Sequence, residues 1–535
     1  MANSDAYLSQ PRIEEQVHLE PNDLLYYLHL ISEKEAQVQS FDGQIEELGR
    51  AHKARVSELK RQKDEYLIEI SVLRNLCTPI RRIPLEILTK ILEFSCLPPR
   101  DSLLRHYDII STIATVSNVC VVWKRAAAAN PKLWSVFCFD TISHSNLLKD
   151  IGWAREWFAR SGSVPLDVHL ELRSFEFSTT PLLECILELH HRIRVLEIAG
   201  AIGKFRPLLS SPLPFPLLEI FFIRLNEWWN VAGNTPMGYL FDHYSPHKIK
   251  SLLGAPRLQQ ITVNDLDCET TTMLALLVLP ESLTSLSWAG ALRSDIRLCA
   301  DALGLCKNLV KLCIEASEPD VGFTESIHSI LLPRLTSLDI VFRETKGKSL
   351  LHCFTTPLLE NLTIIYHGRR YCDLITDLVS FRDRSKLDTV SMFSLQSHGA
   401  NEDISCADWE MILSIFPSIR TLTIGPSDFN NRDTDLDRLI QVMTCTKDDC
   451  LLPKLTAFRL FHLYHRMNSL DMMPMVLSRV CPNDSISDNG QYDRKWLDKV
   501  ILWGACFEEV AQHLSELPGL EVVYYTSIYQ YGHEL

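Results

Sequence analysis

"PRLTSLDI", from Pro333 to Ile340, has the alternation of apolar and polar residues that is typical of a strand with one buried face. Leu335 opens the turn into the strand. Leu338 and Ile340 then point to one side and Ser337 and Asp339 to the other, because successive side chains of a strand alternate in direction. Such a strand cannot bury its apolar side alone, so the octapeptide predicts neighbouring strands of the same kind.

The pattern of a small anchor followed by Leu-x-x-Leu-x-Ile recurs along the rest of the chain. Helical runs such as "DWEMILSIF", before Pro417, are expected to form an outer layer. Between Pro256 and Ser385 successive copies begin 24 to 28 residues apart. The copies begin at His191, Pro216, Pro256, Glu281, Lys307, Pro333, Pro357, Ser385, Pro417, Pro453, Lys495 and Pro518.

These copies resemble leucine-rich repeats, whose period is about 20–29 residues. The resemblance implies a parallel, curved α/β solenoid. The position three residues after the last apolar strand residue, commonly Asn or Cys in that family, holds Ala201 or Arg343, so the solenoid is expected to be irregular. The alternative is a leucine-rich α/β domain that shows this spacing by chance.

The strand positions that point away from the apolar side are expected to line a concave face. They are rich in hydroxyl and amide groups and nearly uncharged, which suits recognition of a target protein through many modest contacts. The alternative is that these polar side chains only face water and bind no partner. Trp228 and Trp229, in a longer insertion, either anchor a partner or cover a loop. The candidate target-binding residues are Thr262, Ser285, Ser287, Ser337, Asp339, Asn361, Thr363, Thr389, Ser391, Thr421 and Thr423.

The segment from Val38 to Leu76 has the spacing of a long helix with an apolar stripe. One row recurs every seven residues at Val38, Ile45, His52, Leu59, Tyr66 and Leu73, and a weaker row lies three residues further on, from Phe41 to Leu76. This spacing is compatible with a coiled coil that makes a homodimer through residues 38–76. The alternatives are one long helix lying on its own domain, or a helical hairpin broken near Gly43 or Gly49. Thr78-Pro79 should end the helix.

Two short apolar helices are expected next. Pro84 fits the first turn of a helix in which Ile83, Ile87, Leu88, Ile91 and Leu92 lie on one side. A second helix, around Ile109 to Ala129, carries Ile113, Val116, Cys120 and Trp123. Their apolar surface exceeds what they can bury against each other, which indicates a partner-binding surface. The alternative is packing against the rest of this chain.

The segment from Ile80 to Trp134 resembles an F-box, on the residues "IPLEIL", "VCVVW" and "PKLW" in that order. The resemblance covers about a tenth of the chain and implies docking on the Skp-type adaptor of a cullin–RING ubiquitin ligase. The insertion from Leu97 to Asp108, together with Val121 and Val122 before Trp123, departs from the usual pattern. The residues implied to form or support the adaptor interface are Pro84, Leu85, Ile87, Leu88, Ile91, Val116, Cys120 and Trp123.

Composition narrows the classes of function. The 535 residues carry a net charge of −14 and show no basic stripe, which argues against nucleic-acid binding. The start of the chain lacks the features of a secretory signal, and no apolar run is long enough for a membrane span. The sixteen cysteines are therefore expected to be buried free thiols in a cytoplasmic and/or nuclear protein. No catalytic motif, metal-ligand spacing or cofactor motif is found, so neither an enzyme nor a cofactor is expected.

The predicted fold class is α+β multidomain: a long N-terminal helix, a small three-helix F-box and a C-terminal irregular α/β leucine-rich-repeat solenoid, or horseshoe. The expected boundaries are an irregular N-terminus at 1–23, the long helix or coiled coil at 24–78, the F-box at 79–138 and the repeats at 139–535. The expected function is substrate recognition for an SCF-type ubiquitin ligase. The alternative is a non-ligase coiled-coil scaffold that uses the repeats for assembly.

Overall fold

The computed structural model describes most of the chain, in separate ranges. The chain divides into two compact units, residues 1–84 and 85–535. The described residues are 20–97, 108–141, 143, 151–172, 179–200, 202–209, 211–225, 255–265, 279–290, 302–317, 329–343, 350–367, 374–398, 406–425, 439–446, 450–461, 472–480, 496–504 and 507–526.

The first unit is built on one uninterrupted helix, α2 (Pro21–Cys77), followed by the short 3-10 helix η1 (Pro79–Arg82). Helix α2 continues through Gly43 and Gly49, so the hairpin alternative is wrong. It ends where Thr78 adopts an extended conformation before Pro79, because proline disfavours helical geometry in the residue that precedes it. None of its residues is buried within the described chain.

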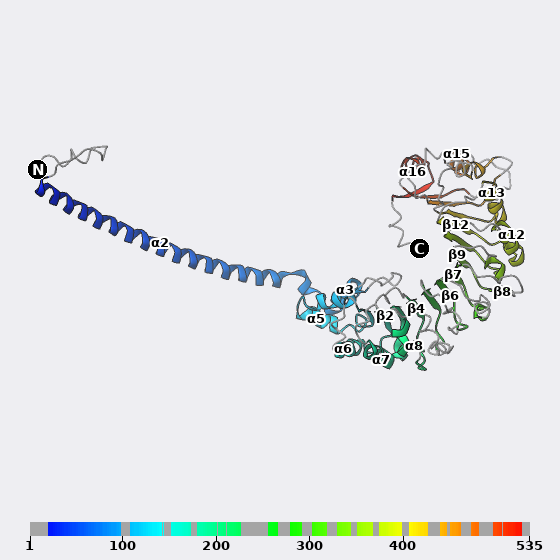
Figure 1. The fold of residues 1–535 in the computed structure, drawn as a ribbon, viewed down its shortest axis with the longest axis horizontal. Helices are drawn as coiled ribbons and strands as arrows, with labels where there is room; N and C mark the ends of the chain where they lie inside the picture. The colour runs from blue at the N-terminus through cyan, green and yellow to red at the C-terminus, as the bar shows by residue number, and fades with distance from the viewer. Residues whose placement is uncertain are drawn as a thin grey trace, which may run out of the picture. The chain divides into compact units, whose positions relative to one another are not determined.

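The second unit contains a 14-stranded sheet in which each strand pairs in parallel with the next strand of the sheet along the chain (Figure 1). Strands β8 (Ile330–Leu331) and β10 (Phe354–Thr355) form a separate parallel pair. The strands of the large sheet are β1 (Val136–Asp140), β2 (Leu166–Leu172), β3 (Ile193–Gly200), β4 (Ile220–Leu225), β5 (Gln260–Asp265), β6 (Ser285–Gly290), β7 (Lys311–Ser317), β9 (Ser337–Arg343), β11 (Asn361–His367), β12 (Met392–His398), β13 (Thr421–Ile424), β14 (Ala457–Phe461), β15 (Lys499–Trp503) and β16 (Glu521–Tyr525).

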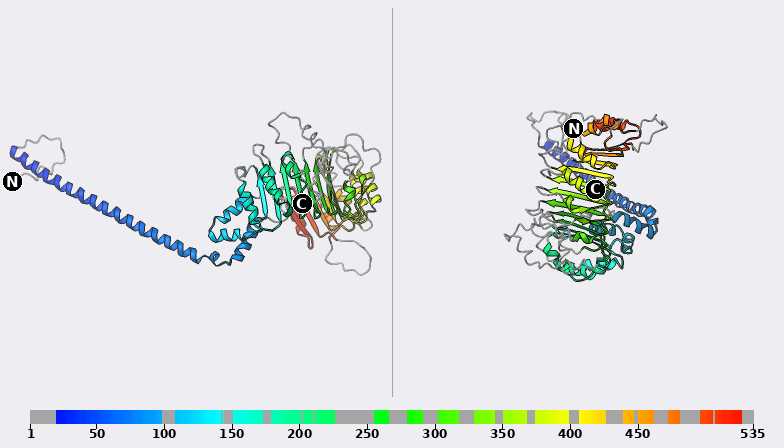
Figure 2. Two further views of the ribbon diagram at one scale, coloured as in Figure 1. Left: turned by 90° about the horizontal axis from the view of Figure 1, so that it is seen from below. Right: turned by 90° about the vertical axis from the view of Figure 1, so that its right-hand side faces the viewer.

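Helices precede the sheet and connect its strands. Figures 1 and 2 show the connecting helices along one side of the sheet. Parallel neighbours need such crossover connections, because a tight turn can join only antiparallel strands. The helices are α3 (Leu85–Cys96), α4 (Ile109–Ser117), α5 (Val121–Ala128), α6 (Gly152–Arg160), α7 (Thr180–Glu188), α8 (Arg206–Leu209), α12 (Leu374–Ser385), α13 (Cys406–Ile415), α15 (Met473–Leu477) and α16 (Glu508–Ser515), with the 3-10 helices η4 (His190–Arg192), η5 (Ile202–Phe205) and η8 (Leu350–Cys353).

The sheet is held together by rows of apolar side chains in register on its helix-covered face. In the middle of the sheet, each residue of one such row pairs with the next across the parallel ladder, and each is at most 1% exposed. Burial of one side chain of this size stabilises the fold by about 1.5–3 kcal/mol. The row contains Leu312, Leu338, Leu362, Phe393, Leu422, Phe458 and Val500.

Helices α3, α4 and α5 pack against one another and belong to the same compact unit as the sheet. Leu88, Leu92 and Ile113 are buried in this group of helices. Trp134, the last residue of "PKLW", is buried and contacts α5 and α6. Its Nε1 donates to the Ala127 carbonyl at 2.8 Å, and its ring packs edge-on against that of Trp157 in α6.

The predicted fold class is therefore wrong. The described residues form an α/β fold, a long N-terminal helix followed by a 14-stranded parallel sheet with its helices, and not an α+β assembly. The repeats build one continuous sheet, and neither a separate three-helix F-box domain nor a leucine-rich-repeat horseshoe is established. The physical reason is that parallel strands joined by crossover helices place helices and strands in one alternating layered structure, which is the α/β class.

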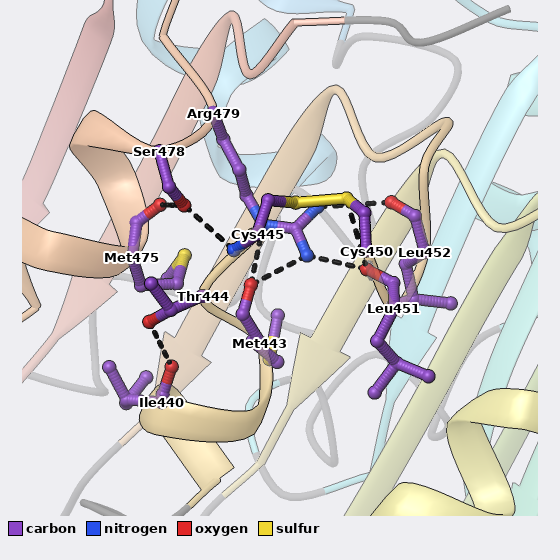
Figure 3. Close-up of a disulfide and its surroundings, with 10 residues drawn as sticks. All are labelled: Ile440, Met443, Thr444, Cys445, Cys450, Leu451, Leu452, Met475, Ser478 and Arg479. Atoms are coloured by element: carbon purple, nitrogen blue, oxygen red, sulfur yellow. Dashed lines mark hydrogen bonds between the residues drawn. A yellow bond between two sulfur atoms is a disulfide. The ribbon is translucent and has the colours of Figure 1, made fainter. Parts of the chain in front are cut away.

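The cysteines only partly follow the prediction. Cys96, Cys138, Cys185, Cys306 and Cys353 are free and buried, as expected. Cys445 and Cys450, however, form a disulfide, with their Cα atoms 4.4 Å apart (Figure 3). The expectation of free thiols was wrong for this pair. The expectation of burial was wrong for Cys77 and Cys120, which are free but exposed.

The chain around this disulfide is held by a buried arginine, Arg479 (Figure 3). Its guanidinium donates hydrogen bonds to the backbone carbonyls of Met443, Leu451 and Leu452. Ser478 Oγ accepts from the Cys445 amide at 3.0 Å. These bonds satisfy carbonyls that would otherwise be buried without a donor.

We expect Arg479→Met to lower the free energy of unfolding by about 3 kcal/mol, because two buried carbonyls and one partly buried carbonyl lose their donor. Urea denaturation measures this loss. The matched control is Arg382→Met, since Arg382 pairs with its neighbour Asp383 at the surface, and a change below about 0.5 kcal/mol is expected. Equal effects of the two substitutions would contradict the role assigned to Arg479.

Candidate functional site

The polar face of the sheet, opposite the helix-covered face, carries most of the residues predicted to bind a target. The first register row across β5 to β13 holds Ser285, Ser337, Asn361 and Thr421, with Lys311 and Met392 between them. The second row holds Thr262, Ser287, Asp339, Thr363 and Thr423, with Cys313 and Ser394 between them. The structure thus brings nine of the eleven candidates together.

Thr389 and Ser391 are the exceptions, because β12 begins at Met392, after both of them. Their hydroxyls donate to the backbone carbonyls of Leu359 and Glu360 in the preceding repeat. The strand positions that the sequence assigned to them are filled by Met392 and Ser394. The assignment failed because Leu387 and Val390 are both buried, so either could have opened the apolar pattern.

The centre of the polar face contains two ionisable groups with shifted pKa values. Burial raises the pKa of the Cys313 thiol to about 11, and the neighbouring Asp339 adds to this shift. The thiol is therefore protonated at neutral pH, which makes it a poor nucleophile. Burial also raises the pKa of Asp339, against a hydrogen bond from Thr363 and the charge of Lys311, which both lower it.

A charged zone at the start of the polar face, on β2 to β4, was missed by the sequence analysis. Asp167 pairs with Arg194 at 2.6 Å, and Glu171 pairs with Arg224 at 2.6 Å. His169 Nδ1 lies 2.7 Å from Glu197. The alternating stretch "LDVHLEL" (166–172) carried the signal, because its polar residues fall on the same side as Ser337 and Asp339 in later repeats.

An aromatic zone at the other end of the same face, on β14 to β16, was also missed. Phe461 and Trp503 stack with ring centroids 4.0 Å apart, and Trp503 stacks on Tyr525 at 5.2 Å. Ile501 and Val523 pack beside them. The polar face therefore changes from ion pairs, through hydroxyls and amides, to stacked aromatic rings along the sheet.

A second candidate surface, here called the helical patch, consists of the exposed apolar side chains of α3 and of the start of α5. On α3 they include Ile87, Ile91 and Phe94, which are 52%, 38% and 84% exposed, and Leu85 at the start of the helix is exposed as well. Their spacing of four and three residues places them along one stripe, beside the buried stripe of Leu88 and Leu92. Val119, Val121 and Val122 complete the patch.

The predicted adaptor-binding residues fall into three groups. Leu85, Ile87, Ile91 and Cys120 are exposed and lie on or next to the helical patch, and Pro84, the last residue of the first unit, is also exposed. Val116 and Trp123 are half-buried. Leu88 is only 1% exposed and belongs to the core of the helices, so it can support the surface but not contact a partner directly.

Some sequence-based expectations lie outside the described residues. They concern the irregular N-terminus up to residue 19, nearly all of the insertion from Leu97 to Asp108, and Trp228 with Trp229. In the ranges that the structure covers, no three His, Cys, Asp or Glu side chains gather in a way that could hold a metal ion. Within those same ranges, none of the helices is both long enough and apolar enough to cross a membrane.

Comparison with known proteins adds no family. The sequence matches no protein-family model. It also shows no significant similarity to a curated protein.

Asp339→Asn tests the electrostatics of the polar face. Because burial raises the folded-state pKa of Asp339, this carboxyl favours folding below its unfolded pKa and loses that contribution as the pH rises through the folded value. The asparagine variant is expected to gain stability relative to the parent as the pH rises from the ordinary pKa of an aspartate through the raised pKa of Asp339, which urea midpoints at several pH values would measure. A variant that loses stability relative to the parent over this range would show that the charged carboxylate has a stabilising partner.

Proposed function

We propose that the protein is a non-catalytic substrate-recognition subunit of an SCF-type cullin–RING ubiquitin ligase. The helical patch docks on a Skp-type adaptor, and the polar face of the sheet holds a target protein. The observation that carries the proposal is the exposed apolar stripe on α3, within a segment that resembles an F-box in three successive motifs. The cytoplasm, the nucleus or both would be its place of action.

The helical patch has the composition of a surface that a partner covers. Helix α3 has two apolar stripes, and packing within the second unit uses only the stripe of Leu88, Leu92 and Cys96. The stripe of Ile87, Ile91 and Phe94 stays in water. A cluster of large exposed apolar side chains is unfavourable unless a binding partner removes it from water.

The half-buried and buried residues of the three F-box-like motifs hold the helices of the helical patch in place. Asn130 donates to the Thr89 carbonyl of α3 at 3.4 Å, and Lys132 forms an ion pair with Glu93 at 3.0 Å. These bonds tie the "PKLW" segment to α3. The residues of the F-box motifs therefore include both contact residues, such as Ile87, and residues that hold the helices together, such as Leu88 and Trp134.

The polar face suits a target that is itself a protein. It runs over many strands and offers hydroxyl, amide and charged groups. Many modest contacts over such a face can select one target protein without any catalytic group. The mechanism is positioning: the bound target raises the effective concentration of its lysines near an activated thioester carried by another subunit.

A second candidate function is a non-ligase scaffold that dimerises through its N-terminal helix. The observation that favours it is that no residue of α2 is buried within the described chain. Light scattering on the protein alone and with added adaptor separates the two functions. A chain that forms dimers and never binds the adaptor would be a scaffold.

The double substitution Ile87→Gln and Ile91→Gln tests adaptor docking. Each side chain contributes about 1.5 kcal/mol if it becomes buried on binding, so affinity for a purified Skp-type adaptor should fall about a hundredfold. Glutamine keeps the helix propensity. Biolayer interferometry measures the affinity, and circular dichroism verifies that the variant is folded.

The matched control is Leu477→Gln in α15, because Leu477 is 54% exposed and lies outside the helical patch. Its affinity for the adaptor should equal that of the parent. Unchanged binding by the double variant would refute the assigned interface. Absence of binding by the parent protein would refute the proposed function itself.

A further inference from the structure

Helix α2 has a surface that nothing in the described chain covers. It spans 57 residues, about 85 Å at 1.5 Å per residue, and none of these residues is buried. Ile45, Leu48 and Tyr66 are each more than 60% exposed. A helix that only crossed solvent would be polar all round, so these apolar side chains indicate a partner.

One set of apolar residues recurs every seven residues along the helix. On a straight α-helix such a row drifts by about 20° per repeat, so a row of this length winds around the helix. Only a partner that supercoils with α2 can stay in contact with all of it. The first row consists of Leu24, Ile31, Val38, Ile45, His52, Leu59, Tyr66 and Leu73.

The row three residues further on decides the orientation of the partner. A parallel, in-register dimer places each residue of this row opposite its own copy. Lys34, Arg55 and Glu69 would then each face a like charge in the seam, which is unfavourable. The second row consists of Tyr27, Lys34, Phe41, Leu48, Arg55, Gln62, Glu69 and Leu76.

We propose that α2 forms an antiparallel two-stranded coiled coil with α2 of a second copy of the chain, with the twofold axis near residue 50. In this register the residue numbers of two facing residues, one from each copy, add up to 100. Every residue of the second row therefore faces a residue of the first row of the other copy. Lys34 then faces Tyr66, and Arg55 faces Ile45. The long stems of lysine and arginine can lie along an apolar neighbour while their charges reach water.

The remaining pairs of the seam are also compatible. Phe41 faces Leu59, Leu48 faces His52, and Tyr27 faces Leu73. Leu76 faces Leu24 at the two ends, and Gln62 and Glu69 face Val38 and Ile31. No position of either row is left without a counterpart, and no like charges meet.

The residues that flank the seam show charge complementarity. Lys63 of one copy lies between Glu35 and Asp42 of the second copy. The twofold axis places Lys63 of the second copy between Glu35 and Asp42 of the first in the same way. Within the described chain these three side chains form no hydrogen bond or ion pair. Arg61, by contrast, pairs with Glu58 and Glu65 of its own helix.

Light scattering on the full chain without adaptor tests the dimer, and charge exchange tests its orientation. The parent protein should have twice the mass of one chain. Lys63→Glu should raise the dissociation constant of the dimer about tenfold, because it places three acidic groups together. The triple variant Glu35→Lys, Asp42→Lys and Lys63→Glu should restore the parent value.

Lys60→Glu, on the outer side of the helix, is the matched control and should leave the dissociation constant unchanged. In a parallel dimer Lys63 would instead lie near Glu58 of the second copy, and the double variant Glu58→Lys with Lys63→Glu would restore dimerisation. That result, or a monomeric parent protein, would overturn the proposal. Because no adaptor is present, failure here leaves the proposed adaptor docking unaffected.

Discussion

Burial of one apolar face along a continuous parallel ladder is the constraint on which the second unit depends. Each strand, such as β9, presents Leu338 and Ile340 to the helix-covered side and relies on both neighbours to exclude water from them. Since every strand of the large sheet pairs with the next strand of that sheet along the chain, the sheet buries its leucines within this chain. What needs explanation is the apolar surface that the sheet does not use.

The described residues carry two such surfaces, which belong to different compact units. The helical patch on α3 and α5 is short, broad and continuous with a tightly packed group of helices, which suits docking on a folded subunit. The stripe on α2 is long, narrow and regular at seven-residue spacing, which suits another helix. The two proposed partners follow from these different geometries, and neither depends on the other. A dimeric receptor would present two target-binding faces together, which raises avidity for a multivalent target.

The sequence predicted the strands well, because alternation is a local property. Ser337 and Asp339 were assigned to the correct face, while Thr389 and Ser391 were not, because two possible apolar anchors lie three residues apart. The charged zone could not be predicted as pairs, since Arg224 and Glu171 are 53 residues apart in the chain. Likewise, helical spacing alone could not show that Leu88 faces inward while Ile87 faces water. The distinction depends on how α3 packs against α4 and α5.

The central claim is that the helical patch is apolar because an adaptor covers it. Hydrogen–deuterium exchange of the full chain, with and without a purified Skp-type adaptor, tests this most directly. The account predicts that the adaptor slows exchange in residues 85–96 and 119–128 and leaves β9, β11 and β12 unchanged. Unchanged exchange in those two segments with saturating adaptor, or protection confined to the sheet, would contradict it.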